Sequence, residues 1–502
     1  MFNPRKRSQS NHFLPYLFIA CLLFSEIASA APSISLSKKS GPPTSKILVS
    51  GGGFKPNVGV DIFFDTKDKA LVVTNGEGEF RNAGIYAPRR ARPGEHWVTA
   101  LERNNDKGAQ EPFVVQTNWS QLGFDADGTR LNAYENVLNP KAAGSLDLNW
   151  SYTTGSGVFS SPAVVNGVVY FGSGDSNVYA LNAHTGARIW NYTTGLVAGT
   201  SPAVANGVVY IGSWDNNLYA LNAHTGAKVW TQSISDVLSS PAVANGAVYV
   251  GSEDGNIYAL NARTGAKLWS YQTGSCCGVS SPAVANGVVY IGSADRNIYA
   301  LNARTGAKLW SYSTGDQVSS SPSVANGVVY IASQDHNVYA LNSRTGAKLW
   351  SYSTGDPIFS STAVANGLVY FGVGSSIDAL SAQTCNLLWS YETGGCCEES
   401  SPAVANGVVY VGSADGNLYA LNARTGARLW NYPTGTTVGS SPAVANGVVY
   451  VGSDDSNLYA FRRMHGPAKQ EVDSKRPDLK TLHLDFSLKV SPPRATPSSP
   501  EL

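Results

Sequence analysis

Between residues 146 and 463 the chain alternates short apolar runs with polar turns, and the pattern returns about every 40 residues. The unit SPAVANGVVYVGSADGNLYALNARTGARLW occurs eight times in closely similar form. Its Ser-Pro pair, once Ser-Thr, begins at Ser161, Ser201, Ser240, Ser281, Ser321, Ser361, Ser401 and Ser441. Tryptophans keep the same period, at Trp150, Trp190, Trp230, Trp269, Trp310, Trp350, Trp389 and Trp430. A fixed period of this length is typical of repeat architectures.

Each unit divides into four short strands. Asn-Gly, as at Asn286-Gly287, favours a two-residue hairpin turn between SPAVA and VVYIGS, because both residues tolerate positive φ. A polar Asp-x-Asn turn then leads to IYALN, and an ARTG turn leads to KLWSY. The apolar spacing of three to four residues that marks helices is absent. The pattern therefore predicts an all-β fold, an eight-bladed β-propeller of four-stranded blades.

Residue size predicts the order of strands within a blade. The SPAVA strand is built from small residues and belongs next to the crowded axis, whereas the Trp strand fits the wide rim. One Trp strand, residues 146–152, precedes the first unit, and the last unit stops at Phe461 without a Trp strand. We therefore expect the Trp150 strand to complete the eighth blade, formed by residues 441–461, which closes the ring without an exposed edge.

The motif ALNARTGAKLW, from Ala300 to Trp310, resembles the tryptophan-docking motif A-x-D-x-x-T-G-x-x-x-W of the pyrroloquinoline quinone (PQQ) repeat family, with Asn302 at the Asp position. The resemblance covers about residues 146–463. It implies a propeller of the quinoprotein alcohol dehydrogenase type, in which the eight tryptophans pack against neighbouring blades and are structural. That family includes quinoprotein alcohol dehydrogenases and non-catalytic relatives such as a propeller lipoprotein of the outer-membrane assembly machinery. Fold alone does not choose between them.

The first thirty residues are typical of a secretory signal. Three basic residues, 5–7, precede an apolar run from Phe13 to Phe24, and Ala28-Ser29-Ala30 is a small-residue cleavage site. We therefore expect a secreted or periplasmic protein cleaved near Ala30. Cys21 stands in a poor version of the lipoprotein signal, so lipid anchoring there is a minor alternative. No other apolar stretch approaches the roughly 18 residues that a spanning helix needs.

The remaining flanks divide into three parts. Residues 33–116 alternate like a small β-sandwich and resemble the immunoglobulin-like modules of secreted bacterial proteins. Residues 117–145 form a polar connector, with Trp119 and Tyr134 available to pack on the propeller. After Met464 the chain is rich in Pro, Ser and Lys, which predicts a disordered tail, residues 464–502.

Residues that recur in the blades serve a role that each blade needs, which is usually folding. The aspartate of the polar turn is best interpreted as a turn residue that accepts hydrogen bonds from its own backbone, rather than as a metal ligand. It occurs at Asp175, Asp215, Asp254, Asp295, Asp335, Asp415 and Asp455. The arginines of the opposite turns, Arg263, Arg304, Arg344 and Arg424, are expected on a solvated rim. Together the two sets predict one acidic-leaning and one basic-leaning face.

A single asymmetric site has to use positions where the blades differ. The loop from the Trp strand to the next inner strand varies most and lies on the usual ligand face of a propeller. The candidate ligand-face residues are Trp214, Asp316, Asp356, Glu398 and Glu399. Blade six departs furthest, because it has lost the Asp-x-Asn turn and carries Cys385 in place of the docking Gly. That Gly accommodates a left-handed backbone, so Cys385 indicates a locally altered turn.

Two pairs of adjacent cysteines, Cys276-Cys277 and Cys396-Cys397, also lie in these variable loops. Consecutive Cα atoms are about 3.8 Å apart, below the roughly 4.4–6.8 Å of ordinary disulfides, so a bond between neighbours is strained and reducible. We favour vicinal disulfides that rigidify the loops; a ligand or cofactor role, free thiols and cross-chain bridges stay open. No His lies near either pair, which disfavours zinc. Cys385 has no obvious partner.

The functional signals favour binding over catalysis. Motifs for nucleophilic, zinc and phosphate chemistry are missing, and no catalytic residue is assigned. The cysteine pairs resemble the vicinal disulfide of quinoproteins, but the calcium ligands and catalytic Asp of that family have no match here. A net charge of +1 gives no reason to expect nucleic acid. We predict a monomeric, extracytoplasmic, non-catalytic binding or scaffolding protein without cofactor, whose partner is a protein or cell-envelope component. The alternative is an alcohol or sugar dehydrogenase dependent on PQQ and calcium.

Overall fold

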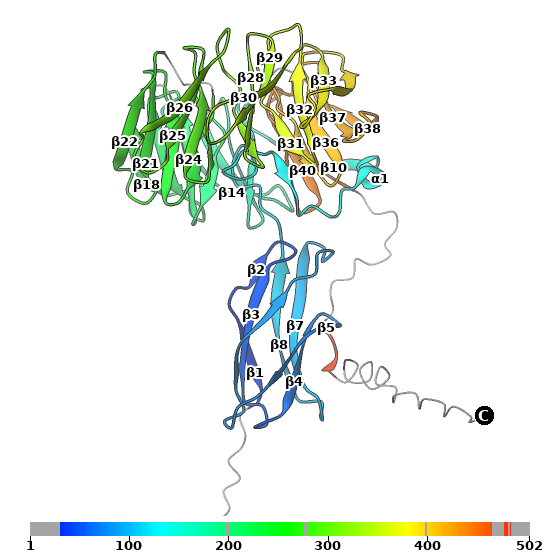
Figure 1. Cartoon of the computed structure of the whole chain (residues 1–502). Helices are drawn as coiled ribbons and strands as arrows, with labels where there is room; N and C mark the ends of the chain where they lie inside the picture. The colour runs from blue at the N-terminus through cyan, green and yellow to red at the C-terminus, as the bar shows by residue number, and fades with distance from the viewer. Residues whose placement is uncertain are drawn as a thin grey trace, which may run out of the picture.

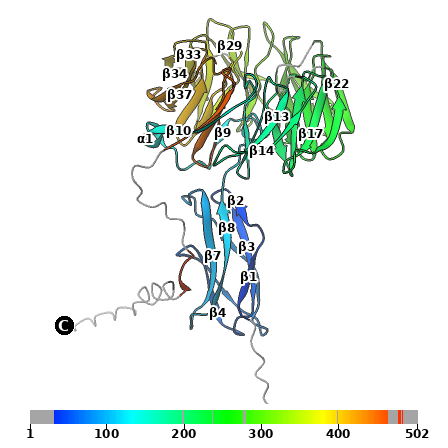
Figure 2. The ribbon, with the colours of Figure 1, turned by 180° about the vertical axis from the view of Figure 1, so that it is seen from behind.

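The structure, a computed structural model, describes residues 31–196, 200–235, 237–275, 280–396, 399–463, 476–479 and 482. An elongated N-terminal module stands against one face of a ring of short strands (Figure 1), and the same arrangement is seen from behind (Figure 2). The predicted signal segment, with Cys21, lies outside these residues. No helix in the described ranges is long and apolar enough to cross a membrane.

The module is the β-sandwich expected for residues 33–116. One sheet has the order β1-β3-β6 and the other β2-β8-β7-β4-β5. The strands are β1 (Ser33–Leu36), β2 (Ser40–Gly41), β3 (Lys46–Gly52), β4 (Gly59–Phe64), β5 (Lys67–Val73), β6 (Phe80–Tyr86), β7 (Gly94–Glu102) and β8 (Gly108–Val115). Alternate residues of both sheets, such as Ile47, Ile62 and Phe113, point inward and form one core. The likeness to immunoglobulin modules stays a prediction.

The ring consists of eight blades, each with four antiparallel strands of the repeat. The inner strands are β11 (Ala163–Val165), β15 (Ala203–Ala205), β19 (Ala242–Ala244), β23 (Ala283–Ala285), β27 (Ser323–Ala325), β31 (Ala363–Ala365), β35 (Ala403–Ala405) and β39 (Ala443–Ala445). The second strands are β12 (Val168–Gly172), β16 (Val208–Ser213), β20 (Ala247–Gly251), β24 (Val288–Gly292), β28 (Val328–Ser333), β32 (Leu368–Val373), β36 (Val408–Gly412) and β40 (Val448–Gly452).

The two outer layers of the ring follow in the same order. The third strands are β13 (Asn177–Asn182), β17 (Asn217–Asn222), β21 (Asn256–Asn261), β25 (Asn297–Asn302), β29 (Asn337–Asn342), β33 (Ser376–Ser381), β37 (Asn417–Asn422) and β41 (Asn457–Arg463). The fourth strands are β14 (Arg188–Thr193), β18 (Lys228–Ser233), β22 (Lys267–Gln272), β26 (Lys308–Ser313), β30 (Lys348–Ser353), β34 (Leu387–Glu392), β38 (Arg428–Pro433) and β10 (Leu146–Thr153). Blades one to eight begin at β11, β15, β19, β23, β27, β31, β35 and β39.

The predicted closure of the ring is confirmed. The eighth blade has the order β10-β41-β40-β39, so the strand of Trp150 pairs with the last strand of the repeats. Consecutive inner strands contact one another around the axis, as their small residues predicted. The Asn-Gly turns also behave as expected: Asn286 and Gly287 both have positive φ, 50° and 78°. Sequence periodicity therefore predicted the strands, their order within each blade and the closure of the ring.

The outer tryptophans dock each blade on the next. In seven of them, Trp150 to Trp389, the indole N–H donates to the carbonyl of residue 183, 223, 262, 303, 343, 382 or 423 in the following blade, at 2.9–3.2 Å. Trp430 differs because the chain leaves the propeller after β41. It packs on Phe461 instead, and the short helix α1 (Pro140–Ala143) contacts β37 and β38 there.

The connector does more than join the two parts, because it runs around the inside of the ring. Carbonyls of Trp119, Ser120, Ala126, Asp127, Thr129 and Arg130 accept hydrogen bonds from the central valine N–H of six inner strands, at 2.7–3.0 Å. Gln121 Oε1 accepts the same bond from Val243, and the Asn132 side-chain amide donates to Val444 O. The short strand β9 (Leu131–Asn132) pairs with β35. The connector thus satisfies inner-strand backbone groups of all eight blades.

Part of the stretch predicted as a disordered tail packs on the module. Gln110 holds the backbone carbonyl of Pro477 at 2.8 Å, and the guanidinium of Arg476 lies 5.3 Å from the centre of the Trp97 ring. Leu482 is buried against Phe63 and Leu101. The prediction of disorder therefore does not hold for the described residues 476–479 and 482.

Candidate binding site between the module and the propeller

The recurrent aspartates are turn residues, as predicted. In blade four, Asp295 accepts hydrogen bonds from the backbone N–H of Asn297 at 3.0 Å, the hydroxyl of Tyr299 at 2.6 Å and the N–H of Gly274 at 2.7 Å. Burial acts to raise the pKa of Asp295, but these hydrogen bonds outweigh it and leave that pKa below its ordinary value. A carboxylate used in this way locks a turn to the neighbouring loop and has no capacity left for a ligand.

The predicted ligand-face residues lie on the face opposite the module, but the structure does not gather them into one site. Trp214 is half exposed in blade two, Asp316 and Asp356 are exposed in blades five and six, and Glu399 is exposed in blade seven. Glu399 lies near Asp454 of blade eight, whose pKa is raised first by burial and then by that carboxylate. Glu398, Cys276, Cys277 and Cys397 lie outside the described residues, so the vicinal disulfides stay a prediction.

The prediction of an altered turn at Cys385 is wrong. Cys385 keeps the left-handed conformation, with φ of 54°, and its N–H donates to Ser381 O at 2.9 Å, as Gly306 N–H does to Asn302 O at 2.8 Å. The thiol is half-buried and forms no disulfide with another described cysteine. The backbone of the repeat therefore imposes its conformation on a residue that disfavours it.

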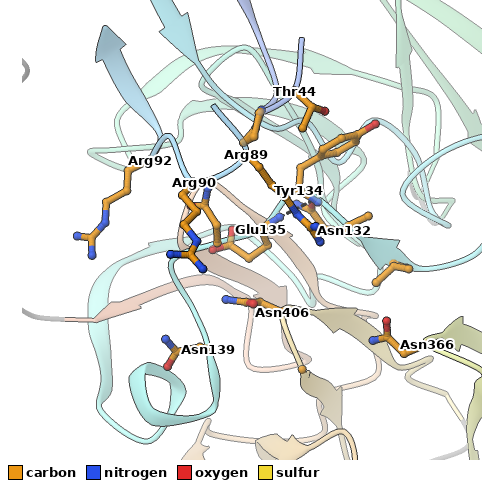
Figure 3. A pocket seen from close by; sticks show the side chains of 15 residues that line it. Thr44, Arg89, Arg90, Arg92, Asn132, Tyr134, Glu135, Asn139, Asn366 and Asn406 are labelled. Carbon is orange, nitrogen blue, oxygen red and sulfur yellow. Dashed lines mark hydrogen bonds between the residues drawn. The ribbon is translucent and has the colours of Figure 1, made fainter. Parts of the chain in front are cut away.

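A large cleft that the sequence did not predict lies where the module meets the propeller. It has a volume of about 1020 Å³ and is lined by three parts of the chain (Figure 3). The module contributes Arg89, Arg90 and Arg92; the connector contributes Tyr134 and Asn136; and the first hairpin turns of blades six and seven contribute Asn366 and Asn406. A space of this size matches the roughly 300–1,000 Å³ of ligand pockets.

The cleft is positively charged and polar. Arg89, Arg90 and Arg92 are exposed, and none of them forms an ion pair with another residue of the described ranges. The one carboxylate in the lining, Glu135, is buried and already accepts backbone N–H bonds from Val137, Leu138 and Gly447 at 2.7–3.0 Å. Glu135 therefore anchors the connector to blade eight. The guanidinium groups keep their capacity for an acidic ligand.

One polar atom of the lining is unsatisfied. The Asn136 side-chain amide donates to Ala91 O at 2.8 Å, whereas its Oδ1 is buried without a hydrogen-bond partner among the described residues. Buried acceptors are normally paired. An acceptor beside three arginines can also receive a donor from a bound peptide. Sequence reasoning missed this site because its residues come from three separate segments, although the cluster of arginines at residues 89–92 was a visible signal.

The described residues enclose one small cavity where the connector meets the inner strands. The cavity there has a volume of about 20 Å³, far below the size of a tricyclic quinone and its surroundings. The described residues also contain no cluster of three His, Cys, Asp or Glu side chains that could hold a metal ion. The residues that line this cavity therefore do not fit PQQ and calcium.

Comparison with known proteins defines the class of the ring. A family model described as outer membrane protein assembly factor BamB matches residues 194–284 and 277–466, more than half of the chain. A second model, described as the β-propeller domain of glucose, ethanol and alcohol dehydrogenases, matches residues 119–200. Together with the eight docked blades, these matches define a propeller of the quinoprotein type. The chain belongs to the PQQ-repeat β-propeller family, as the tryptophan motif predicted.

Individual relatives include both enzymes and a BamB protein. The dehydrogenase subunit of the quinone alcohol dehydrogenase of Gluconobacter oxydans is 43% identical over 70 residues, 12% of this chain and 9% of that protein. The chain thus spans about a tenth of the length of the curated relatives it matches. The quinohemoprotein alcohol dehydrogenase of Comamonas testosteroni has a TM-score of 0.62 at 20% identity, covering 71% of this chain and 82% of that one. BamB of Moraxella catarrhalis has a TM-score of 0.57 at 22% identity, covering 63% and 99%. These structural likenesses show the fold alone.

Proposed function

We propose that this chain is an extracytoplasmic, non-catalytic binding or scaffolding protein that holds an acidic segment of a partner protein in the cleft between module and propeller. The observation that carries the proposal is the cleft itself, which Arg89, Arg90 and Arg92 line without forming an ion pair with any described residue. Planar guanidinium groups bind carboxylates with two parallel hydrogen bonds, so an acidic peptide suits this lining.

The propeller supports this role as a rigid base. The eight blades are closed and docked, and the connector fixes the module side of the ring through Glu135 and Asn132. The exposed rim arginines Arg263, Arg304, Arg344 and Arg424 lie at the module end of the strands, whereas the aspartate turns lie at the far end. The resulting basic face attracts an acidic partner toward the cleft. The matching family model, described as outer membrane protein assembly factor BamB, supports a role through protein contacts.

The binding proposal is tested with the full chain and a defined acidic probe, a poly-glutamate peptide, by titration calorimetry at low and high salt. Replacing Arg89, Arg90 and Arg92 by Gln should weaken binding at least tenfold. The matched control replaces Arg263, Arg304 and Arg344, three exposed rim arginines outside the cleft, and should weaken it less than threefold. Equal losses in both variants, or no measurable binding by the wild type, would overturn the proposal.

The alternative function is a dehydrogenase that uses PQQ and calcium, in keeping with the enzyme relatives. It is tested by incubating the purified chain with PQQ and Ca²⁺ and following reduction of an artificial electron acceptor with alcohols and sugars. Under the binding proposal we expect no turnover above the rate with PQQ alone. Turnover that depends on the chain would replace the binding proposal with the enzymatic one.

A further inference from the structure

Eight serines form a closed ring of hydrogen bonds around the propeller axis. The backbone N–H of each serine in the Ser-Pro pairs donates to Oγ of the corresponding serine in the next blade at 2.9–3.0 Å, and the bond from Ser441 to Ser161 closes the circle. A hydroxyl that accepts such a bond still has its own hydrogen to donate. No acceptor for these eight hydrogens is found in the described part of the chain.

A buried cation lies on the connector in the same channel. The Arg130 side chain is 2% exposed, and the one hydrogen bond found for its guanidinium within the described ranges runs from Nη1 to Leu122 O at 3.3 Å. Its burial lowers the pKa of Arg130 to about 10, so the group is still charged at neutral pH. A buried charge that forms no ion pair is costly. No described carboxylate forms an ion pair with it.

The serines and the arginine line one small cavity. It has a volume of about 20 Å³, and its wall includes Arg130 with Ser240, Ser281 and Ser321. About 10–15 Å³ suffices for one water molecule, so the space accommodates a single small ion. The guanidinium and the hydroxyl hydrogens are donors, which is the chemistry that binds an anion, although the Asp125 carboxylate also lines the cavity.

We propose that this axial cavity binds one small monovalent anion of halide size, held by the Arg130 guanidinium and by the hydroxyl hydrogens of Ser240, Ser281 and Ser321. The anion would neutralise the buried arginine and tie the connector to the inner strands of blades three, four and five. The site is independent of the cleft, whose arginines belong to the module.

Two carboxylates oppose the anion. Asp125 lines the same cavity, and Asp127 follows it on the connector. Asp125 is exposed to solvent but also lines the cavity, and burial of its carboxyl group and then the Asp127 charge raise its pKa to about 6. Burial likewise raises the pKa of Asp127. Because protonation removes negative charge next to Arg130, halide affinity should rise as the pH falls from 7.5 to 5.5, and Asp125→Asn should raise it at pH 7.5.

The first experiment follows thermal unfolding of the full chain while sodium chloride or bromide replaces sodium gluconate at constant ionic strength. The wild-type Tm should rise with halide and saturate, as binding to the folded state requires. Arg130→Met, which keeps the side-chain length, should lose at least four fifths of that shift. The matched control Arg304→Met, on the exposed rim, should keep it. A wild-type Tm that ignores halide, or an unchanged shift in Arg130→Met, overturns the proposal.

A second measurement needs no variant. Crystals of the wild-type chain grown or soaked in bromide should show an anomalous peak inside the cavity, within about 3.5 Å of the Arg130 guanidinium. A cavity that holds water alone under these conditions overturns the proposal, even if Arg130→Met fails to fold.

Discussion

Blades four and six have the same strand order but use different side chains to hold it. In blade four, Asp295 joins the polar turn to the loop below it through Asn297, Tyr299 and Gly274. In blade six that turn is one residue shorter, and Asp378 stands where the tyrosine would be. Ser375 and Ser376 donate instead to Glu392, at 2.8 and 2.9 Å. The aspartate and the tyrosine of the repeat are thus lost together.

The difference shows that the turn aspartate and the tyrosine of the repeat act as a pair. Where the tyrosine is absent, its aspartate partner is absent too, and the residue at the tyrosine position, Asp378, has a hydrogen bond with Ser390 instead. Asp378 is buried, and its Oδ1 has no hydrogen-bond partner among the described residues. Burial raises the pKa of Asp378, and the Glu392 charge adds to the rise. Blade six therefore keeps the backbone of the repeat, and its side chains are destabilised instead.

Acid should produce the largest effect, because it acts on many regular blades at once. The pKa values of Asp175, Asp254, Asp295, Asp415 and Asp455 are lowered, since hydrogen bonds outweigh burial. Their stabilisation is fully present above the unfolded pKa of about 3.9 and is lost as the pH falls through the lower folded values. We expect little change in the urea midpoint of unfolding from pH 7 to 5 and a steep fall below about pH 4. In hydrogen exchange, the turns of regular blades should lose protection before blade six. Simultaneous loss would contradict the comparison.

A single aspartate in a regular blade should give the next largest effect. Asp295→Ala removes a carboxylate that accepts hydrogen bonds from four donor groups and leaves the Tyr299 hydroxyl without its acceptor, so the free energy of unfolding should fall by about 2 kcal/mol. The measurement is urea denaturation at pH 7. Ser375→Ala at the corresponding turn of blade six should cost less than about 0.5 kcal/mol, because it removes one exposed hydrogen bond. Similar losses at both turns would show that blade six is held as the others are.

Blade six should gain from losing its buried carboxylate. Asp378→Leu fills part of the tyrosine position with apolar atoms and should raise the free energy of unfolding by about 1.5 kcal/mol at pH 7. The folded pKa of Asp378 is raised, so the wild type is penalised most when the pH is above that pKa and least below the unfolded value. The gain should therefore shrink at pH 4. Asp378→Asn, which keeps a polar group there, should gain less. A gain that is equal at both pH values would exclude the carboxylate charge as its cause.

The sequence predicted well the features that recur in all eight repeats. The strands, the docking of Trp310 and the closure at Trp150 follow from periodicity and residue size. The axial course of the connector does not, because its contacts use backbone carbonyls that any residue carries. One clue was available: eight inner edge strands need acceptors for their exposed N–H groups. The cleft depends on how the module is placed against the ring, and short sequence patterns do not encode that placement. The arginines at residues 89–92 are its one local signal in the sequence.

The smallest effect concerns Cys385, which adopts the left-handed backbone conformation that glycine has in the other repeats. A Cβ added to Gly306 would lie 2.7 Å from the Trp269 ring, which shows how closely the docking indole approaches this position. Cys385 carries such a Cβ at φ of 54°, and its indole neighbour Trp350 is half-buried, whereas Trp269 is buried. Cys385→Gly should relieve both the left-handed strain and the crowding, raising the free energy of unfolding by about 1 kcal/mol. The reciprocal variant Gly306→Cys should lower it by at least as much. Urea denaturation under reducing conditions measures both, and a loss of stability in Cys385→Gly would mean that the thiol makes a contact worth more than the strain.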